Sequence, residues 1–193
     1  MEHLKRYFKK NPVIAALRNR EEFKKALWTD AIALFVLSGS ISELSEMMNM
    51  ARDYDKLIFL HIDLINGIAA DKEGVSFLAK NNLCDGIVTT RSNLIKEAQK
   101  RDLMAVQRLF LLDSAALKSG EKMIKNNDPD AIEILPGIAA PYFIDHVSDR
   151  HDCPIIAGGL IREKKEINEL IEKGVMAISS SDYHLWNYEI ISD

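Results

Sequence analysis

Two short loops near the carboxyl end of the sequence carry the residue types that bind anions. Residues 157–161 (AGGLI) place two glycines directly after an apolar run, and residues 179–182 (SSSD) place three serines after the next one. Glycine lets the backbone approach an anion closely, and N–H groups at a helix start attract negative charge. We expect a short helix through Tyr183 and Trp186 to add such a start. The phosphate-binding residues predicted here are Gly158, Gly159, Ser179, Ser180 and Ser181. Turn glycines and a capping serine without any ligand are the alternative.

A second group of polar residues lies inside otherwise apolar runs. His61 and Asp63 are two positions apart, so on a strand both side chains would point to the same side, away from the apolar face that packs against helices. Glu133 lies in an apolar run (AIEIL), and a buried carboxylate needs a partner, for which Arg108 is the natural cation. Gln107 and Arg108 are adjacent, and the sequence does not say which of them points inward. Acid–base catalysis, a metal site and a polar lining for ligand hydroxyls stay open, although the spacing is not typical of a metal site.

The elements that must position these residues form a regular series. Eight apolar runs start roughly 18 to 28 residues apart and alternate with helical segments such as residues 42–54. The runs are 13–17, 31–37, 57–62, 85–89, 104–111, 131–135, 154–157 and 175–179. Continuous apolar strands are typical of a parallel sheet covered by helices. We therefore predict a single domain over residues 1–193, an α/β fold of the (β/α)8 TIM type in a short variant. Residues 1–11 would form an arm or an extra helix. A doubly wound open sheet is the alternative, weakened because no GxGxxG follows the first strand.

This fold explains why distant residues belong to one site. In β/α barrels the functional groups lie at the carboxyl ends of the strands, and phosphate is frequently bound by the loops after the last two strands. Glycines after the seventh run and serines after the eighth fit that arrangement.

Bulk composition adds limits rather than a function. The chain has a formal net charge of −4 and 47% hydrophobic residues, and no apolar run reaches the ~18 residues that cross a bilayer. Its first ten residues lack an apolar signal core, and Cys84 and Cys153 lack metal-type spacing, so we expect a cytoplasmic protein with reduced thiols. Basic residues gather at the amino end, where Tyr7 and Phe8 could stack on unpaired bases. A solvated face is the ordinary interpretation of such a group.

Several motifs together resemble the glycerol-3-phosphate-responsive antiterminator family, over about residues 12–186. They are HIDLING (61–67), TTRSNLI (89–95), VQRLFLLDS (106–114), IEILPG (132–137) and AGGLIR (157–162). The resemblance implies a regulator of glycerol uptake genes rather than an enzyme. It would bind glycerol 3-phosphate as effector, use no cofactor and no metal, and prevent transcription termination on a leader mRNA.

The resemblance also distributes the ligand over the residues named above. Phosphate would lie on Gly158, Gly159 and the three serines, and the glycerol hydroxyls would meet some of His61, Asp63, Arg108 and Glu133. It identifies no RNA-contacting residue and no membrane partner, and it leaves a homo-oligomer open. The alternative is a barrel enzyme acting on a small phosphorylated substrate, of the phosphosugar isomerase or aldolase type, with His61 and either Glu133 or Asp63 as its acid–base groups.

Overall fold

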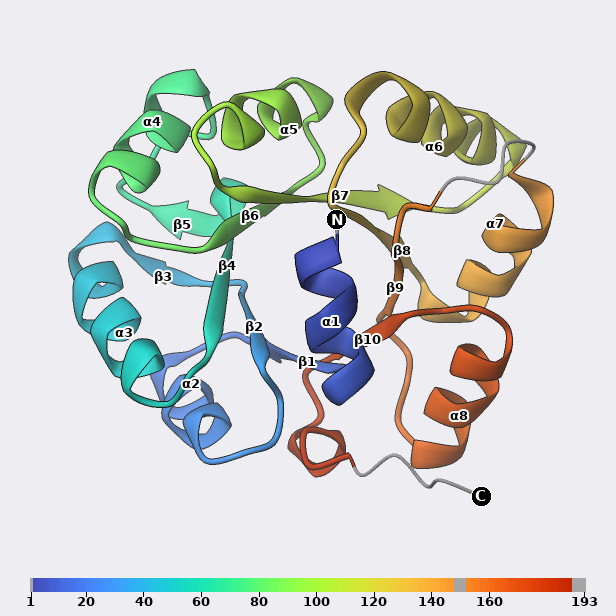
Figure 1. Cartoon of the computed structure of the whole chain (residues 1–193), viewed down its shortest axis with the longest axis horizontal. Helices are drawn as coiled ribbons and strands as arrows, with labels where there is room; N and C mark the ends of the chain where they lie inside the picture. Colours follow the sequence, from blue (N-terminus) through green and yellow to red (C-terminus); the bar gives the residue numbers. More distant parts are fainter. Residues whose placement is uncertain (1, 148–151, 189–193) are drawn as a thin grey trace.

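Eight parallel strands close into a barrel (Figure 1). The computed structural model describes residues 2–147 and 152–188. The order around the barrel is β1-β10-β9-β8-β7-β6-β4-β2, and β1 pairs with both β2 and β10, which closes the sheet. The strands are β1 (Val13–Leu17), β2 (Ala33–Val36), β4 (Leu57–His61), β6 (Gly86–Thr89), β7 (Met104–Phe110), β8 (Ala131–Leu135), β9 (Ile155–Gly158) and β10 (Ala177–Ser180). The predicted barrel is confirmed, and the open-sheet alternative is wrong.

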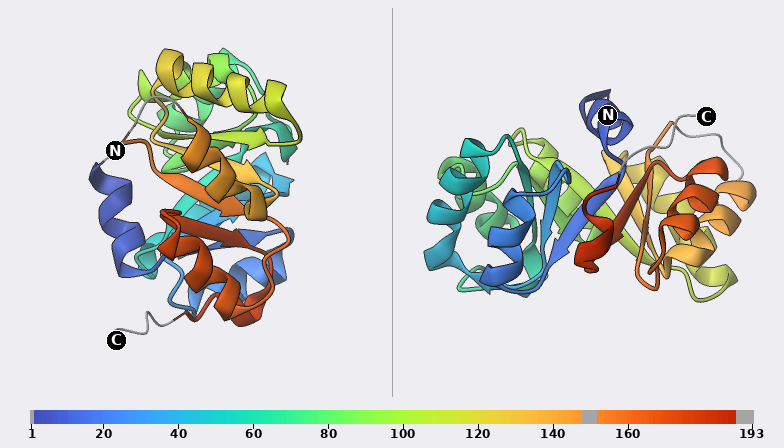
Figure 2. Two further views of the ribbon diagram at one scale, coloured as in Figure 1. Left: turned by 90° about the vertical axis from the view of Figure 1, so that its right-hand side faces the viewer. Right: turned by 90° about the horizontal axis from the view of Figure 1, so that it is seen from below.

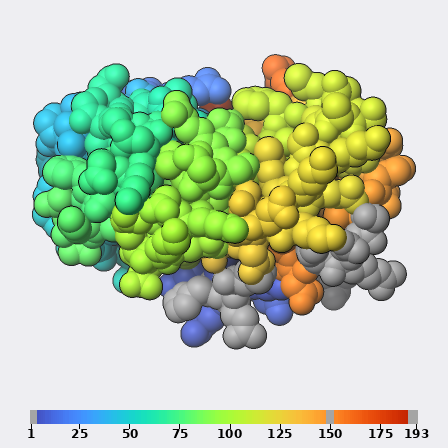
Figure 3. Space-filling view, turned by 90° about the horizontal axis from the view of Figure 1, so that it is seen from above, coloured from blue at the N-terminus to red at the C-terminus, as the bar shows by residue number. Residues whose placement is uncertain are grey.

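Helices follow the strands and cover the outside of the barrel. They are α2 (Arg20–Leu27), α3 (Ile41–Asp53), α4 (Lys72–Lys80), α5 (Ser92–Gln99), α6 (Ser114–Asn127), α7 (Ala140–His146) and α8 (Lys164–Glu172). Local chemistry sets where they begin: Asn19, Asp71 and Asp113 each accept a hydrogen bond from a first-turn N–H group. Helices α4, α5 and α6 lie side by side on one flank (Figure 3). Among the described residues, no helix is long and apolar enough to cross a membrane.

Alternation along the strands divides the core into two layers. Leu34, Ile87 and Ile178 belong to the layer between the strands and the helices, whereas Phe35 and Phe59 belong to the interior of the barrel. Toward the carboxyl ends of the strands the interior becomes polar. On β7 and β8 the inward-facing residues Val106 and Ala131 are followed, two positions further on, by Arg108 and Glu133, which lie side by side in the register of the sheet.

The same alternation decides between the adjacent residues Gln107 and Arg108. Val106 lies in the interior cluster, so Arg108, two residues further on, also faces inward. Gln107 faces the helices, is fully buried, and donates from Nε2 to the carbonyl of Thr89 at 3.2 Å.

The amino end of the barrel is closed by a helix. Residues 2–10, for which the sequence left an arm or an extra helix open, form α1 (Glu2–Lys10), which projects beyond one end of the barrel (Figure 2). Leu4 and Phe8 are buried and pack into the interior cluster, beside Leu57 and Met104 at the starts of their strands. Phe8 therefore cannot stack on a base. The carboxyl ends of the strands lie at the opposite end.

Short elements complete the loops at those carboxyl ends. Strands β3 (Gly39–Ser40) and β5 (Ile65–Asn66) pair with each other outside the barrel. The 3-10 turns η1 (Ile62–Leu64), η2 (Gly137–Ala139) and η3 (Tyr183–Leu185) follow β4, β8 and β10.

Candidate functional site

A cavity of about 940 Å³ lies at the carboxyl ends of the strands and is here named the mouth cavity. Arg108 and Glu133 line its base, and Gly159, Ser179, Ser180 and Ser181 line one side. Arg18 and Arg162 line its rim. The register of the barrel brings these positions together: Ser179 on β10 is level with Ile14 on β1 and with Gly158 on β9.

A buried ion pair forms the base of the cavity. Arg108 donates from Nε to Glu133 Oε2 at 2.6 Å, and the two side chains are 10% and 1% exposed. Ser179 Oγ donates to the other carboxylate oxygen, Oε1, at 2.5 Å. Glu133 thus has the cationic partner that its burial requires. The pair adds no net charge to the cavity, and among the described residues Arg108 donates to a side chain only through Nε.

The two glycines after β9 serve different purposes. A Cβ atom at Gly158 would lie 2.6 Å from Ser179 Oγ and 2.7 Å from Glu133 Oε1, so this glycine makes room for the buried network. Gly158 does not line the cavity, in contrast to our prediction that it contacts phosphate. Gly159 does line it, with φ at +76°, and Leu160 follows with φ at +62° and its side chain 71% exposed. A left-handed conformation is costly for leucine, and such strain concentrates at ligand-binding loops.

The three serines after β10 also differ. Ser179 faces the interior and binds Glu133, whereas Ser180 Oγ accepts from the N–H of Asp182 at 3.1 Å and so fixes the loop. Ser181 is exposed and lines the cavity. The short helix expected after them is the single 3-10 turn η3, and Asp182 caps it by accepting from the N–H of His184 at 3.0 Å. The prediction of a free positive helix end at this point is wrong, because the protein's own carboxylate occupies it.

His61 is buried in the barrel interior beside the ion pair. Its side chain is 7% exposed, and Nδ1 has no hydrogen-bond partner among the described residues. Burial, followed by the charge of Arg108, lowers the pKa of His61 to about 4, against the opposing effect of Asp63. The imidazole is therefore neutral at pH 7. Its 3.7 Å contact with Asp63 is then no ion pair, although the geometry alone would suggest one. His61 does not line the mouth cavity.

Asp63 lies elsewhere than predicted. Strand β4 ends at His61, so Asp63 is in the turn η1 and does not share a strand face with His61. Its carboxylate accepts from Thr89 Oγ1 at 2.9 Å and from Arg91 Nε at 2.7 Å, and Arg91 also donates to the carbonyl of Ala70 at 3.0 Å. Asp63 therefore joins the loops after β4 and β6, outside the cavity.

Two arginines at the rim were not among the predicted site residues. Arg18 directly follows β1 and Arg162 follows the glycine loop after β9. Both are exposed, and among the residues that the structure describes neither guanidinium has a carboxylate partner. The neighbouring Glu22 and Glu166 accept instead from the backbone N–H groups of these arginines, at 2.6 and 2.8 Å. For Arg18, a basic residue directly after a strand was the available signal in the sequence; Arg162 lies beyond the glycine loop after β9.

The pocket therefore has a neutral polar base, a glycine loop with positive φ angles, and a rim that carries two exposed arginines and Asp182. Within residues 2–147 and 152–188, no three His, Cys, Asp or Glu side chains converge as a metal site would require. These features define a β/α barrel with a polar pocket at the carboxyl ends of its strands.

Comparison with known proteins supplies the family. The model of the family described as "Glycerol-3-phosphate responsive antiterminator" matches residues 13–186. The crystal structure of the glycerol uptake operon antiterminator regulatory protein from Listeria monocytogenes is 34% identical, with a TM-score of 0.85 over 93% of this chain and 96% of that one.

Two further relatives cover nearly the whole chain. An antiterminator-related protein of the glycerol uptake operon from Thermotoga maritima is 30% identical, with a TM-score of 0.81 over 91% of this chain and 98% of that one. The uncharacterized protein YgcP of Escherichia coli is 30% identical over 92% of this chain and 93% of its own length. This chain belongs to the glycerol-3-phosphate-responsive antiterminator family, and the resemblance in its motifs is confirmed.

Proposed function

We propose that this protein senses glycerol 3-phosphate in the mouth cavity and, when occupied, binds a leader mRNA and prevents transcription termination. The observation that carries the proposal is the charge arrangement of the cavity. Its base is neutral because Arg108 and Glu133 compensate each other, while the Arg18 and Arg162 guanidinium groups at the rim form no ion pair within the described residues. A ligand with a charged end and a hydroxyl-bearing end matches this division.

The division orients the ligand. The phosphate lies at the rim, where Arg18, Arg162 and the backbone of Gly159 and Ser181 surround it. The glycerol hydroxyls point to the base, where the Glu133 carboxylate accepts hydrogen bonds and the Arg108 Nη groups donate them. Ser179 and Gly158 support Glu133, Ser180 fixes the loop after β10, and no cofactor or metal takes part.

His61 and Asp63 support the site without contacting the ligand. Neutral His61 fills the interior beside Arg108, and Asp63 holds the loops after β4 and β6 together. The alternative of a phosphosugar isomerase or aldolase is not favoured, because its acid–base group must reach the reacting atom. Neither His61 nor Asp63 lines the cavity, and Glu133, which does, is held by Arg108 and Ser179.

The test measures transcription through a terminator. A template carrying the leader of a glycerol uptake operon is transcribed by the host polymerase, with and without this protein and glycerol 3-phosphate. We expect full-length transcript to rise only when both are present, because the ligand must favour the RNA-binding state. Read-through that is unchanged by glycerol 3-phosphate would refute the proposed function. Arg20→Gln, an exposed residue outside the cavity, serves as the control for a rim variant such as Arg162→Gln.

A further inference from the structure

A second and larger cavity, of about 1150 Å³, lies at the amino end of the barrel between α1 and the loops that precede β2, β4 and β6. We name it the α1 groove. Its basic lining residues are Arg6, Lys10, Arg52 and Lys56, its aromatic ones Tyr7, Tyr54 and Tyr188, and its acidic ones Asp30, Asp55 and Asp85. We propose that the α1 groove binds an unpaired segment of RNA. This inference rests on the proposed function, to which it adds the surface that meets the RNA.

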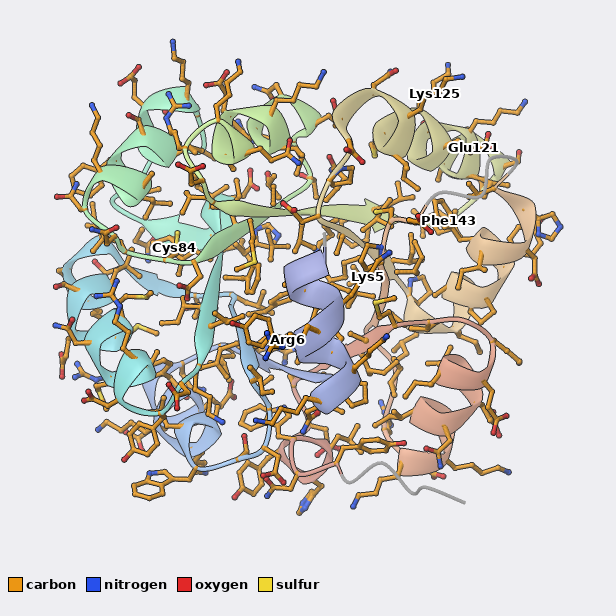
Figure 4. The ribbon with its side chains drawn as sticks, viewed as in Figure 1. Lys5, Arg6, Cys84, Glu121, Lys125 and Phe143 are labelled. Carbon is orange, nitrogen blue, oxygen red and sulfur yellow. The ribbon has the colours of Figure 1, made fainter. Side chains whose placement is uncertain are left out.

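Cations of the groove come from two separate elements. Arg6 leaves α1 on the side of β2 and β4, whereas Lys5 leaves it on the other side (Figure 4). Lys10 and Arg52 are exposed like Arg6, and within the described part of the chain none of the three has a carboxylate partner at ion-pair distance. Cations without such partners release counterions when they meet a phosphate backbone, which drives nucleic-acid binding.

Lys56 contributes differently from the three exposed cations. Its Nζ donates to the carbonyl of Thr29, and burial lowers its pKa, while Asp30 and Asp55 oppose that effect. It therefore ties the wall of the groove together. The phosphate contacts fall to Arg6, Lys10 and Arg52.

Aromatic rings flank these cations. Tyr7 and Tyr54 line the groove, and the ring of Trp28 meets that of Tyr54 edge to face, with the ring centroids 5.0 Å apart. Trp28 is 77% exposed, which is unusual for so large an apolar side chain in a folded protein. Trp28 does not itself line the groove but adjoins it through Tyr54, and an exposed indole is a platform on which an unpaired base can stack.

The carboxylates in the groove distinguish RNA from a simple anion. The Asp85 carboxylate already accepts a hydrogen bond from the backbone N–H of Ile58, at 2.7 Å. Asp30 and Asp55 remain on the wall and would repel a small polyanion that filled the cavity. A nucleic-acid strand separates its phosphates from its bases, so phosphates can meet the cations while amino groups of the bases meet the carboxylates. The mixed lining therefore favours a single strand over inorganic phosphate.

The position of the groove suits a regulated protein. The mouth cavity is at the carboxyl ends of the strands and the groove at their amino ends, so the ligand and the RNA can be bound together. Helix α1 forms one wall of the groove and inserts Leu4 and Phe8 into the barrel interior. That interior cluster continues toward the layer of Arg108 and Glu133. Helix α1 thus connects the groove wall to the packing beneath the mouth cavity.

The test uses RNA selected from a random-sequence pool on the full chain with glycerol 3-phosphate present. Fluorescence anisotropy then compares Arg6→Gln/Arg52→Gln and Trp28→Ala with a control, Lys100→Gln/Arg101→Gln, whose residues directly follow α5 and pair with Glu97. We expect each groove variant to bind RNA at least about tenfold more weakly than the wild type. The slope of log affinity against log salt concentration should become shallower by about 0.7 for each phosphate that the replaced arginines neutralise. Trp28→Phe should restore much of the affinity, because phenylalanine still stacks.

Two further readouts separate the possible failures. Stabilisation by glycerol 3-phosphate should be the same in the groove variants as in the wild type, which shows that they fold and keep the mouth cavity. Groove variants that bind RNA as the wild type does would overturn the inference and leave the proposed function intact. If the wild-type protein selects no RNA, the proposed function and the inference both fail. If it selects the same RNA without the ligand, control by glycerol 3-phosphate fails, while the groove variants still test the inference.

Discussion

Glu133→Gln separates the charge of the mouth cavity from its shape. In the wild-type protein the Glu133 carboxylate accepts from Arg108 and from Ser179, and all three side chains are buried. Glutamine has nearly the same size but leaves the Arg108 charge without compensation. Breaking a buried ion pair costs about 3 to 5 kcal/mol. We expect the lower end, about 3 kcal/mol, because the glutamine carbonyl still accepts one hydrogen bond.

The assay is thermal unfolding followed by circular dichroism, with and without ligands. For a chain of 193 residues, about 3 kcal/mol lowers Tm by about 10 °C. The unpaired Arg108 should also make the cavity cationic, so inorganic phosphate should raise Tm more in Glu133→Gln than in the wild type. Glu169→Gln, which removes an exposed carboxylate on α8, is the control and should change neither quantity. An unchanged Tm for Glu133→Gln, or a smaller phosphate effect than in the wild type, would refute the role assigned to the ion pair.

Three further predictions concern the same end of the barrel. Gly158→Ala should destabilise the fold by about 3 kcal/mol in urea unfolding, because its Cβ collides with the buried network. Gly159→Ala should cost only about 1 kcal/mol, since only its positive φ is unfavourable; equal costs would contradict the two roles. His61 is neutral when folded but binds a proton near pH 6.5 when unfolded, so it favours unfolding as the pH falls from 6.5 toward 4. In His61→Gln the free energy of unfolding should therefore decrease by about 2 to 3 kcal/mol less than in the wild type over this pH range. An equally steep decrease in both proteins would contradict the prediction. Arg18→Gln and Arg162→Gln should each weaken glycerol 3-phosphate binding about tenfold in calorimetry and leave Tm unchanged; undiminished affinity would show that the phosphate lies elsewhere.

The barrel could be predicted because its signal is local and repeated. Each strand is a short apolar run bounded by polar residues, and the observed strands begin and end within a few residues of the predicted runs. Position along that series then placed the loops after β9 and β10 at one end of the barrel, because all parallel strands point the same way.

The roles of individual site residues depended on contacts that the sequence does not contain. Gly158 is a glycine because Ser179 and Glu133 meet beside it, and these two residues are 46 positions apart. Asp63 was misplaced because β4 ends two residues earlier, and the alternation of a strand does not continue through a 3-10 turn. Arg162 lines the mouth cavity although the glycine loop separates it from β9, so its position along the sequence did not single it out. Local sequence patterns therefore predict the strands and helices of the barrel, whereas the contacts of individual residues in the cavity depend on packing between distant parts of the chain.

The central claim is that the mouth cavity recognises both ends of glycerol 3-phosphate. Isothermal titration calorimetry with glycerol 3-phosphate, glycerol and inorganic phosphate, each added to the wild-type protein, tests it most directly. We predict one site per chain that binds glycerol 3-phosphate at least about tenfold more tightly than either part, since rim and base each contribute. Equal affinity for inorganic phosphate would mean that the base recognises nothing, and the absence of any binding would contradict the account as a whole.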